Sequence, residues 1–290
     1  MEDTLYTTFE RQGNITIITQ TTKANRTCRA KKISENEFVN LTTGEICEYG
    51  ERSVNRSQCH RSLLRTFATI RGIVNANATD PHKVRFVTLT YADPVDDTET
   101  LYRDFSAFWK RFVRWSSKCD FEKPEYLVVC EPNAPNETPD GKQRFHFHLL
   151  LFYQSKAPFL PNDDIGRIWQ HGFTKVSKVD DVDNLGAYLS AYLSDVFVDD
   201  GLGDDVKEID GERKAIIKGG RLHLYPAGFN IYRCSRGVKR PTKRQMSEKE
   251  ANEYRKTHKQ TFSSVKTIRN DKAGFETTVF KEWFNELSDD

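Results

Sequence analysis

The sequence of 290 residues lacks any apolar run close to the ~18 residues that a membrane-spanning helix needs, and charged residues make up 30% of it. A membrane-spanning protein is therefore excluded. The first ten residues include acidic side chains and no apolar stretch, so no secretory signal is predicted and we expect a cytoplasmic protein. With 37% hydrophobic residues, the chain has enough apolar side chains for one large domain or two modest ones.

Cysteine is sparse, and no two of the six cysteines form a C-x-x-C pair. This favours reduced structural thiols over a disulfide scaffold. Cys28, Cys47, Cys59 and His60 are a conceivable zinc set, but their spacings match no zinc-finger pattern. The G-x-x-x-x-G-K-[ST] motif of P-loop proteins is also missing, so any unwinding of DNA would depend on a separate helicase.

The pattern of apolar residues predicts an α+β fold with a mostly antiparallel central sheet flanked by helices. Period-two and β-branched segments predict strands over 14–19, 37–42, 84–91, 125–131, 144–153 and 173–179. Apolar residues three and four apart predict helices from residue 55 or 57 to 74 and over 98–118, 163–170 and 183–193. We divide the chain into an N-terminal extension (1–80), a central domain (81–245) and a charged C-terminal tail or helix (246–290).

Positive charge is concentrated in two places, although the whole chain carries only +2. The first is the helix before residue 74, and the second is a strip without acids; their cations are Arg56, Arg61, Arg65 and Arg71, and Arg233, Arg236, Lys239, Arg240, Lys243 and Arg244. Such clusters suit contacts with DNA phosphates, on duplex DNA in the case of the helix. A solvated basic surface has the same sequence pattern.

The segment RFHFHLLLFY carries the first chemical signal. Because side chains alternate between the faces of a strand, His146 and His148 project together while Phe145 and Phe147 enter the core. Glu131 ends the preceding strand, and a hairpin would bring its carboxylate beside the two imidazoles. Two histidines and one carboxylate favour Mg²⁺ or Mn²⁺ with open positions for water or phosphate, with zinc as a further choice. Two half-buried histidines bonded to their neighbours would give the same pattern.

Tyr188 and Tyr192 lie four residues apart and so share one face of the helix predicted over 183–193. An amphipathic core stripe has the same spacing. Combined with a metal group, however, the pair acquires a chemical meaning, because a tyrosine with a free pKa of about 10 needs an activated phosphodiester to act as a nucleophile. The combination predicts a site that nicks DNA.

The chain from about residue 84 to 241 resembles the HUH endonucleases, and within them the rolling-circle replication initiators of small plasmids and single-stranded DNA phages. The matching segments follow the family order: FVTLTY (86–91), EYLVVCEP (125–132), FHFHLLL (145–151), IWQHGFTKV (168–176), YLSAYLSD (188–195) and SRGVKRP (235–241). The resemblance implies that His146, His148 and Glu131 bind the metal and that Tyr188 and Tyr192 are the nucleophiles. Many relatives have a lysine three residues after the first tyrosine, where this chain has Ala191; Lys175, Lys178 or the basic strip would have to replace it.

The resemblance also implies the reaction. Single-stranded origin DNA is nicked by a tyrosine, which leaves a 5′-phosphotyrosyl enzyme and a 3′-OH primer for a polymerase of the bacterial host, beside a host helicase. Thr88, Thr90, Lys175, Arg233, Arg236, Lys239 and Arg240 are the candidate DNA contacts, and Thr88 and Thr90 suit an ordinary polar sheet face equally well. Two alternatives stay open: a relaxase or transposase with the same chemistry, and a non-catalytic initiator or repressor that binds duplex DNA.

Overall fold

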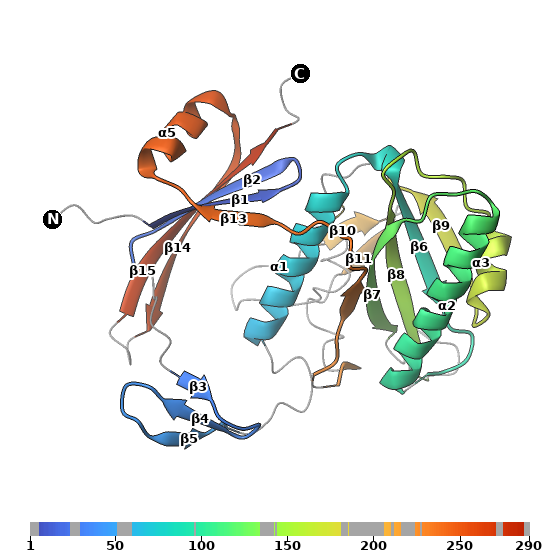
Figure 1. The fold of residues 1–290 in the computed structure, drawn as a ribbon, viewed down its shortest axis with the longest axis horizontal. Coiled ribbons are helices and arrows are strands. Elements are labelled where there is room, and N and C mark those ends of the chain that lie inside the picture. Colours follow the sequence, from blue (N-terminus) through green and yellow to red (C-terminus); the bar gives the residue numbers. More distant parts are fainter. Residues whose placement is uncertain are drawn as a thin grey trace. The chain divides into compact units, whose positions relative to one another are not determined.

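The structure is a computed structural model of the chain (Figure 1). The contacts divide it into two compact units, one of residues 1–53 and 241–290 and the other of residues 54–240, which are described separately. It describes residues 6–23, 30–50, 60–95, 97–133, 142, 144–180, 185, 206–209, 212–215, 224–226, 228–270 and 275–286.

A five-stranded sheet forms the centre of the 54–240 unit, in the order β12-β7-β8-β6-β9. All four neighbouring pairs are antiparallel, which confirms the predicted sheet type. The strands are β6 (Val84–Thr90), β7 (Glu125–Asn133), β8 (Arg144–Phe152), β9 (Thr174–Lys178) and β12 (Tyr232–Cys234). A separate hairpin pairs β10 (Val206–Ile209) with β11 (Glu212–Ala215).

Helices lie on both sides of this sheet, with α1 on one side and α2 and α3 on the other (Figure 1). They are α1 (His60–Asn77), α2 (Thr98–Lys118) and α3 (Asn162–Trp169), and a short 3-10 turn, η2 (Pro81–Lys83), precedes β6. Helix α2 begins at Asp97, whose carboxylate accepts hydrogen bonds from the backbone N–H groups of Glu99 and Thr100. Its buried residues, which include Leu101, Phe105 and Phe108, recur three and four apart and so cover one face.

Aromatic side chains fill the space between the sheet and α2. Phe147 on β8 lies in ring contact with Tyr102 and Phe105 of α2 and with Trp169 of α3. Tyr91, just after β6, packs against Phe147 and Trp169 as well. Because residues alternate along β8, the burial of Phe147 on this side directs His146 and His148 to the opposite face.

The second unit joins both ends of the chain in one sheet, ordered β13-β1-β2-β15-β14. Its strands are β1 (Tyr6–Gln12), β2 (Ile15–Thr21), β13 (Thr242–Gln245), β14 (Gln260–Asn270) and β15 (Phe275–Asn285). Helix α5 (Glu248–Thr257) covers part of one face through a small core of Ile18, Met246, Ala251 and Phe284. A further three-stranded sheet consists of β3 (Ala30–Lys32), β4 (Glu37–Asn40) and β5 (Ile46–Glu48).

The C-terminal segment differs most from the sequence-based expectation. Instead of a charged tail or a single helix, α5 is followed by β14 and β15, two strands of 11 residues each. Charged residues conceal the alternation of Phe275–Asn285, in which Val279 and Trp283 lie on one face and Phe280 and Phe284 on the other. The helix predicted over 183–193 lies outside the described residues except for Leu185. The assignment of residues 1–80 to origin binding and of 81–245 to nicking stays a prediction.

Candidate metal centre

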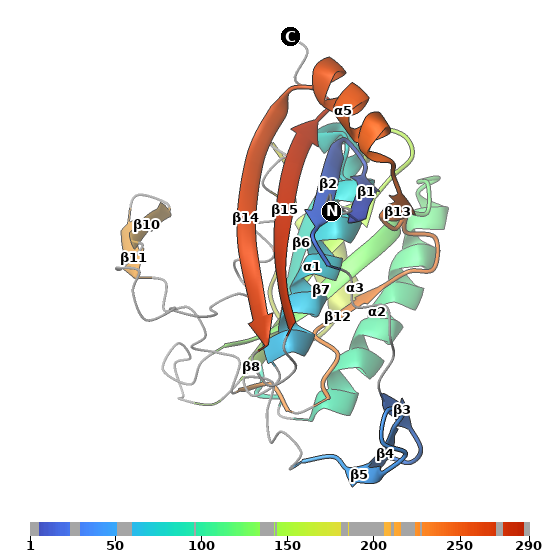
Figure 2. The same ribbon diagram turned by 90° about the vertical axis from the view of Figure 1, so that its left-hand side faces the viewer.

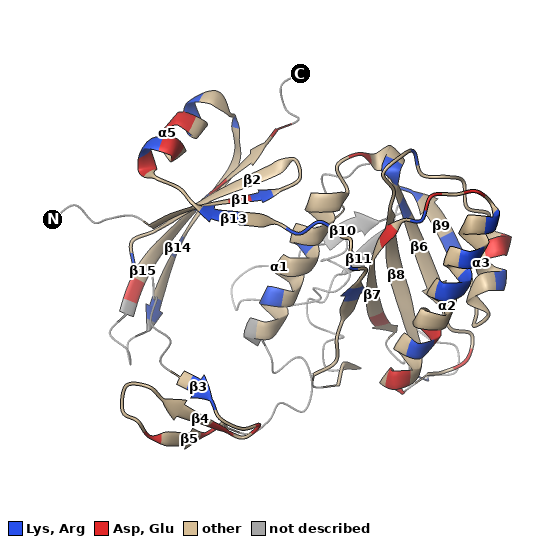
Figure 3. Cartoon of the chain, in the orientation of Figure 1, with Lys and Arg blue, Asp and Glu red and all other residues tan. Residues whose placement is uncertain are grey.

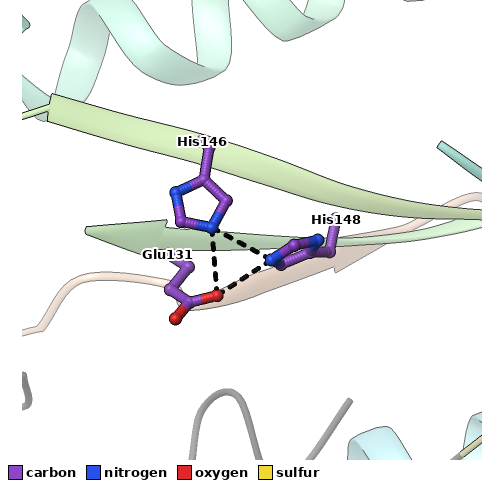
Figure 4. Close-up of side chains that lie close together, drawn as sticks. All are labelled: Glu131, His146 and His148. Atoms are coloured by element: carbon purple, nitrogen blue, oxygen red, sulfur yellow. Dashed lines mark hydrogen bonds and ion pairs between the residues drawn. The ribbon is translucent and has the colours of Figure 1, made fainter. Parts of the chain in front are cut away.

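Strand register brings the two histidines and the glutamate together. Strands β7 and β8 pair so that Glu131 lies directly opposite His146, and His148 is two residues further along the same face of β8. Figure 4 shows the three side chains pointing toward one another from these two strands. Glu131 Oε2 lies 3.1 Å from His146 Nε2 and 2.9 Å from His148 Nε2, and the two Nε2 atoms are 3.0 Å apart.

The donor set and its spacing fit a divalent metal ion. One ligand atom from each residue lies within 4.8 Å of the others. Ligands at neighbouring octahedral positions, each 2.0–2.1 Å from the metal, are about 2.9 Å apart, whereas those of tetrahedral zinc are about 3.3 Å apart. The observed separations of 2.9–3.1 Å match one face of an octahedron. Within the described ranges, no other group of three or more His, Cys, Asp and Glu residues has such spacing.

The electrostatics of the group keep Glu131 ionised. Burial of the carboxylate, which is 1% exposed, acts to raise its pKa, but hydrogen bonds and positive charge from His146 and His148 outweigh that effect and lower the pKa to about 2. A carboxylate at neutral pH is the form that ligates metals. The cluster therefore offers a charged ligand in a site that is largely closed to water.

Two neighbours that the sequence analysis did not select hold the histidines in place. The side-chain oxygen of Asn133 lies 2.9 Å from Nδ1 of His146, and the ring of Phe86 stacks on that of His148 with centroids 5.4 Å apart. A hydrogen bond at Nδ1 leaves the Nε2 lone pair of a neutral imidazole directed at the metal position. Asn133 follows Glu131 by two residues and so shares its face, which is the signal that would have indicated it.

Three of the predicted DNA contacts lie on the same face as the metal group. Thr90 pairs with His146 and Thr88 with His148 across β6 and β8, and Lys175 on β9 pairs with Thr88. The side chain of Lys175 is exposed. The Thr90 hydroxyl donates to the backbone oxygen of Phe173 at 2.8 Å, so it also anchors the turn before β9. A row of polar side chains thus runs from the metal group toward the edge of the sheet.

The basic strip does not gather at the metal group. Arg233 pairs with Val128 of β7, so it lies on the face opposite the histidines, where its guanidinium sits 3.6 Å from the centre of the Tyr102 ring. Lys239 is tied to α1 through its backbone, which exchanges hydrogen bonds with the Asn77 amide. Arg236, Lys239 and Arg240 are exposed. Figure 3 shows Lys and Arg on β13 and on the segment that leads into it.

Both predicted nucleophiles, Tyr188 and Tyr192, lie outside the described residues, as do Arg56 and the side chain of Arg61. Leu185, three residues before Tyr188, is buried in the core of the 54–240 unit. The segment that bears the tyrosines therefore leaves from that core.

Comparison with known families assigns this region a role. Residues 84–197 match the family model of the replication-associated protein ORF2. The ORF2 match begins at β6, contains the metal group and extends past both tyrosines. No curated protein and no solved structure matches the chain. None of the helices in the described part is long and apolar enough to span a membrane.

Proposed function

We propose that the protein is a rolling-circle replication initiator of the HUH type, which nicks and rejoins single-stranded origin DNA through a tyrosine. The observation that carries the proposal is the Glu131–His146–His148 group within the ORF2 match. A replication protein with a buried two-histidine, one-carboxylate site has the means to handle a phosphodiester. The proposal includes a cytoplasmic bacterial host that supplies the helicase and the polymerase.

The three ligands would hold Mg²⁺ or Mn²⁺, as the near-octahedral spacing of their donor atoms favours. When bound, the ion withdraws charge from the scissile phosphate and so makes phosphorus open to attack. Asn133 fixes the tautomer of His146. Thr88, Thr90 and Lys175 lie along the same sheet face and would contact the DNA backbone. Arg236, Lys239 and Arg240 would add contacts outside the metal group.

Tyr188 or Tyr192 supplies the nucleophile in this proposal. The phenolic oxygen, as it loses its proton, forms a bond to phosphorus while the bond from phosphorus to the 3′ oxygen breaks. The products are a 5′-phosphotyrosine and a free 3′-OH, and the proton ends on the departing 3′ oxygen or in water. Because the phosphotyrosine keeps the diester bond energy, a later attack by a 3′-OH rejoins strands without ATP.

The decisive experiment incubates the full chain with single-stranded oligonucleotides tiled across its native replicon, with Mn²⁺ or with EDTA. We expect an adduct that survives denaturation, requires Mn²⁺, and is absent from the double variant Tyr188→Phe, Tyr192→Phe. Tyr49→Phe, which alters an exposed tyrosine just after β5, is the matched control and keeps the adduct. Specific binding to duplex DNA with no adduct on any strand would contradict nicking and leave a DNA-binding initiator. Adducts confined to a transfer origin or a transposon end would instead identify a relaxase or a transposase.

A further inference from the structure

Strand β14 forms one edge of its sheet and is unusually exposed there. It pairs with β15 on one side, and none of the strands in the described part of the chain pairs with its outer side (Figure 2). Three large apolar residues on it are open to solvent: Phe262 is 60% exposed, Val265 65% and Ile268 44%. An edge strand of 11 residues with unpaired backbone groups and apolar side chains is a template for another strand.

The opposite edge of the same sheet is protected. Strand β13 has only four residues, follows Pro241 and carries Lys243 and Arg244, which pair with Glu10 and Glu250. Short length, proline and charge are the usual means by which edge strands avoid pairing. The contrast indicates that β14 is kept open for a partner.

The sequence of β14 is complementary to itself in one antiparallel register. In antiparallel pairs, residues directly opposite share a face, and a two-fold axis at Val265 sets residue 265 + n against residue 265 − n of the second copy. Val265 then meets Val265, and Phe262 meets Ile268. Lys266 meets Ser264, Thr267 meets Ser263, and Arg269 meets Thr261. Every large apolar residue faces an apolar one, and each cation faces a hydroxyl.

Neighbouring registers lose this match. An axis at Ser264 sets Phe262 against Lys266, and an axis at Lys266 sets two lysines against each other. Like charges directly opposite destabilise a strand pair, whereas aromatic and β-branched residues across strands stabilise it. We therefore propose that two copies of this chain associate through β14, centred on Val265, to form one sheet that continues across the dimer.

Size measurement by sedimentation or light scattering, from low to high micromolar concentration, tests the dimer in the full chain. The wild type should shift from monomer to dimer. Val265→Lys places two lysines at the axis and should weaken association by at least tenfold, and circular dichroism checks that it is folded. Leu64→Lys is the control, because Leu64 is also exposed, at 51%, but lies on α1. It should dimerise as the wild type does.

Cysteine cross-linking tests the register. The proposed axis brings the two Val265 Cα atoms to about 4.5–5.5 Å, within the span of a disulfide, so Val265→Cys should give a covalent dimer under oxidising conditions. The two Thr267 positions would be offset by four residues, or about 13 Å, so Thr267→Cys should not exceed the wild type. A wild type that is monomeric throughout, which would leave the edge to a different protein or to nucleic acid, overturns the proposal. A dimer unaffected by Val265→Lys, or equal cross-linking of the two cysteine variants, does so as well.

Discussion

Asn133 and His146 meet across β7 and β8, with the amide oxygen of Asn133 2.9 Å from Nδ1 of His146. The same imidazole directs Nε2 toward Glu131 and His148. An amide oxygen only accepts hydrogen bonds, so it requires a proton on Nδ1 and leaves Nε2 free to bind a metal. This one contact sets both the tautomer and the orientation of a metal ligand.

Removal of that contact should weaken metal binding without removing a ligand. We expect Asn133→Ala to lower the affinity for Mn²⁺ by about 10- to 100-fold, the usual effect of losing an outer hydrogen bond to a histidine ligand. Titration calorimetry with Mn²⁺ measures it. Asn133→Asp keeps an acceptor oxygen and should restore most of the affinity; equal losses in the two variants would show that Asn133 does not act through this hydrogen bond.

Metal binding should stabilise the folded protein. At a Mn²⁺ concentration 100 times the Kd, we expect a gain of about 2.7 kcal/mol in the unfolding free energy, seen as a rise of several degrees in the Tm. Glu131→Gln removes the anionic ligand and should abolish the rise. Glu125→Gln, on the same strand and face but six residues away, should keep it. A rise that persists in Glu131→Gln would place the ion elsewhere.

The sequence was sufficient to predict the metal group because only local patterns were needed. Alternation along β8 placed the two histidines on one face, and a hairpin with β7 added Glu131. The part played by Asn133 depends on register and on rotamers, which no local pattern contains. Helix α2 was predicted at its observed bounds, because Asp97 caps it and its apolar positions recur with helical spacing.

The sheet of the terminal unit could not be predicted from neighbouring residues. Strand β15 pairs with β2, so Val279 lies opposite Thr21, more than 250 residues away along the chain. Pairing of this kind is decided by tertiary packing rather than by propensity. The face occupied by Arg233 was equally hidden, since a charged strip has no defined side until β12 is paired with β7.

Lys175 should contribute to binding of single-stranded DNA through its position in the row with Thr88 and His148, two strand spacings or about 10 Å from the latter. We expect Lys175→Ala to lower affinity and to reduce the slope of log K against log salt by about 0.7, the value for one phosphate contact on a single strand. Fluorescence anisotropy at several salt concentrations measures both. Lys178→Ala is the matched control on the same strand, because its pairing with Arg85 places it on the other face.

Gly172 should tolerate no larger side chain. A Cβ atom there would lie 2.5 Å from the backbone oxygen of Thr90 and 2.6 Å from the backbone nitrogen of Ala92, and neither atom can move without disturbing the end of β6. We expect Gly172→Ala to destabilise the protein by about 1–3 kcal/mol, as overpacking does. Chemical denaturation measures the change. Gly50→Ala, where a Cβ meets no atom within 4 Å, should be nearly neutral.

Glu122 should make stability depend on pH in the acid range. Its carboxylate accepts hydrogen bonds from the backbone N–H groups of Gln154 and Ser155 and from the Ser155 hydroxyl, at 2.6–3.1 Å. Partial burial acts to raise the pKa of Glu122, but these hydrogen bonds outweigh it and lower the pKa below its ordinary value of 4.5. A depressed pKa in the folded state stabilises the protein above the unfolded-state pKa, and that contribution is lost as the pH falls through the folded-state value.

Glu122→Gln should therefore lower the free energy of unfolding by about 1 kcal/mol at pH 7, the scale of a hydrogen bond to a partly exposed group. The difference between wild type and variant should shrink as the pH falls below about 4.5, because the wild-type carboxyl becomes protonated and resembles the amide in charge. Urea unfolding at a series of pH values measures it. Glu99→Gln, at an exposed position in the first turn of α2, controls for the loss of one negative charge in the same unit. A difference that stays constant down to pH 3 would mean that packing of Glu122, rather than its ionised hydrogen bonds, stabilises the loop after β8.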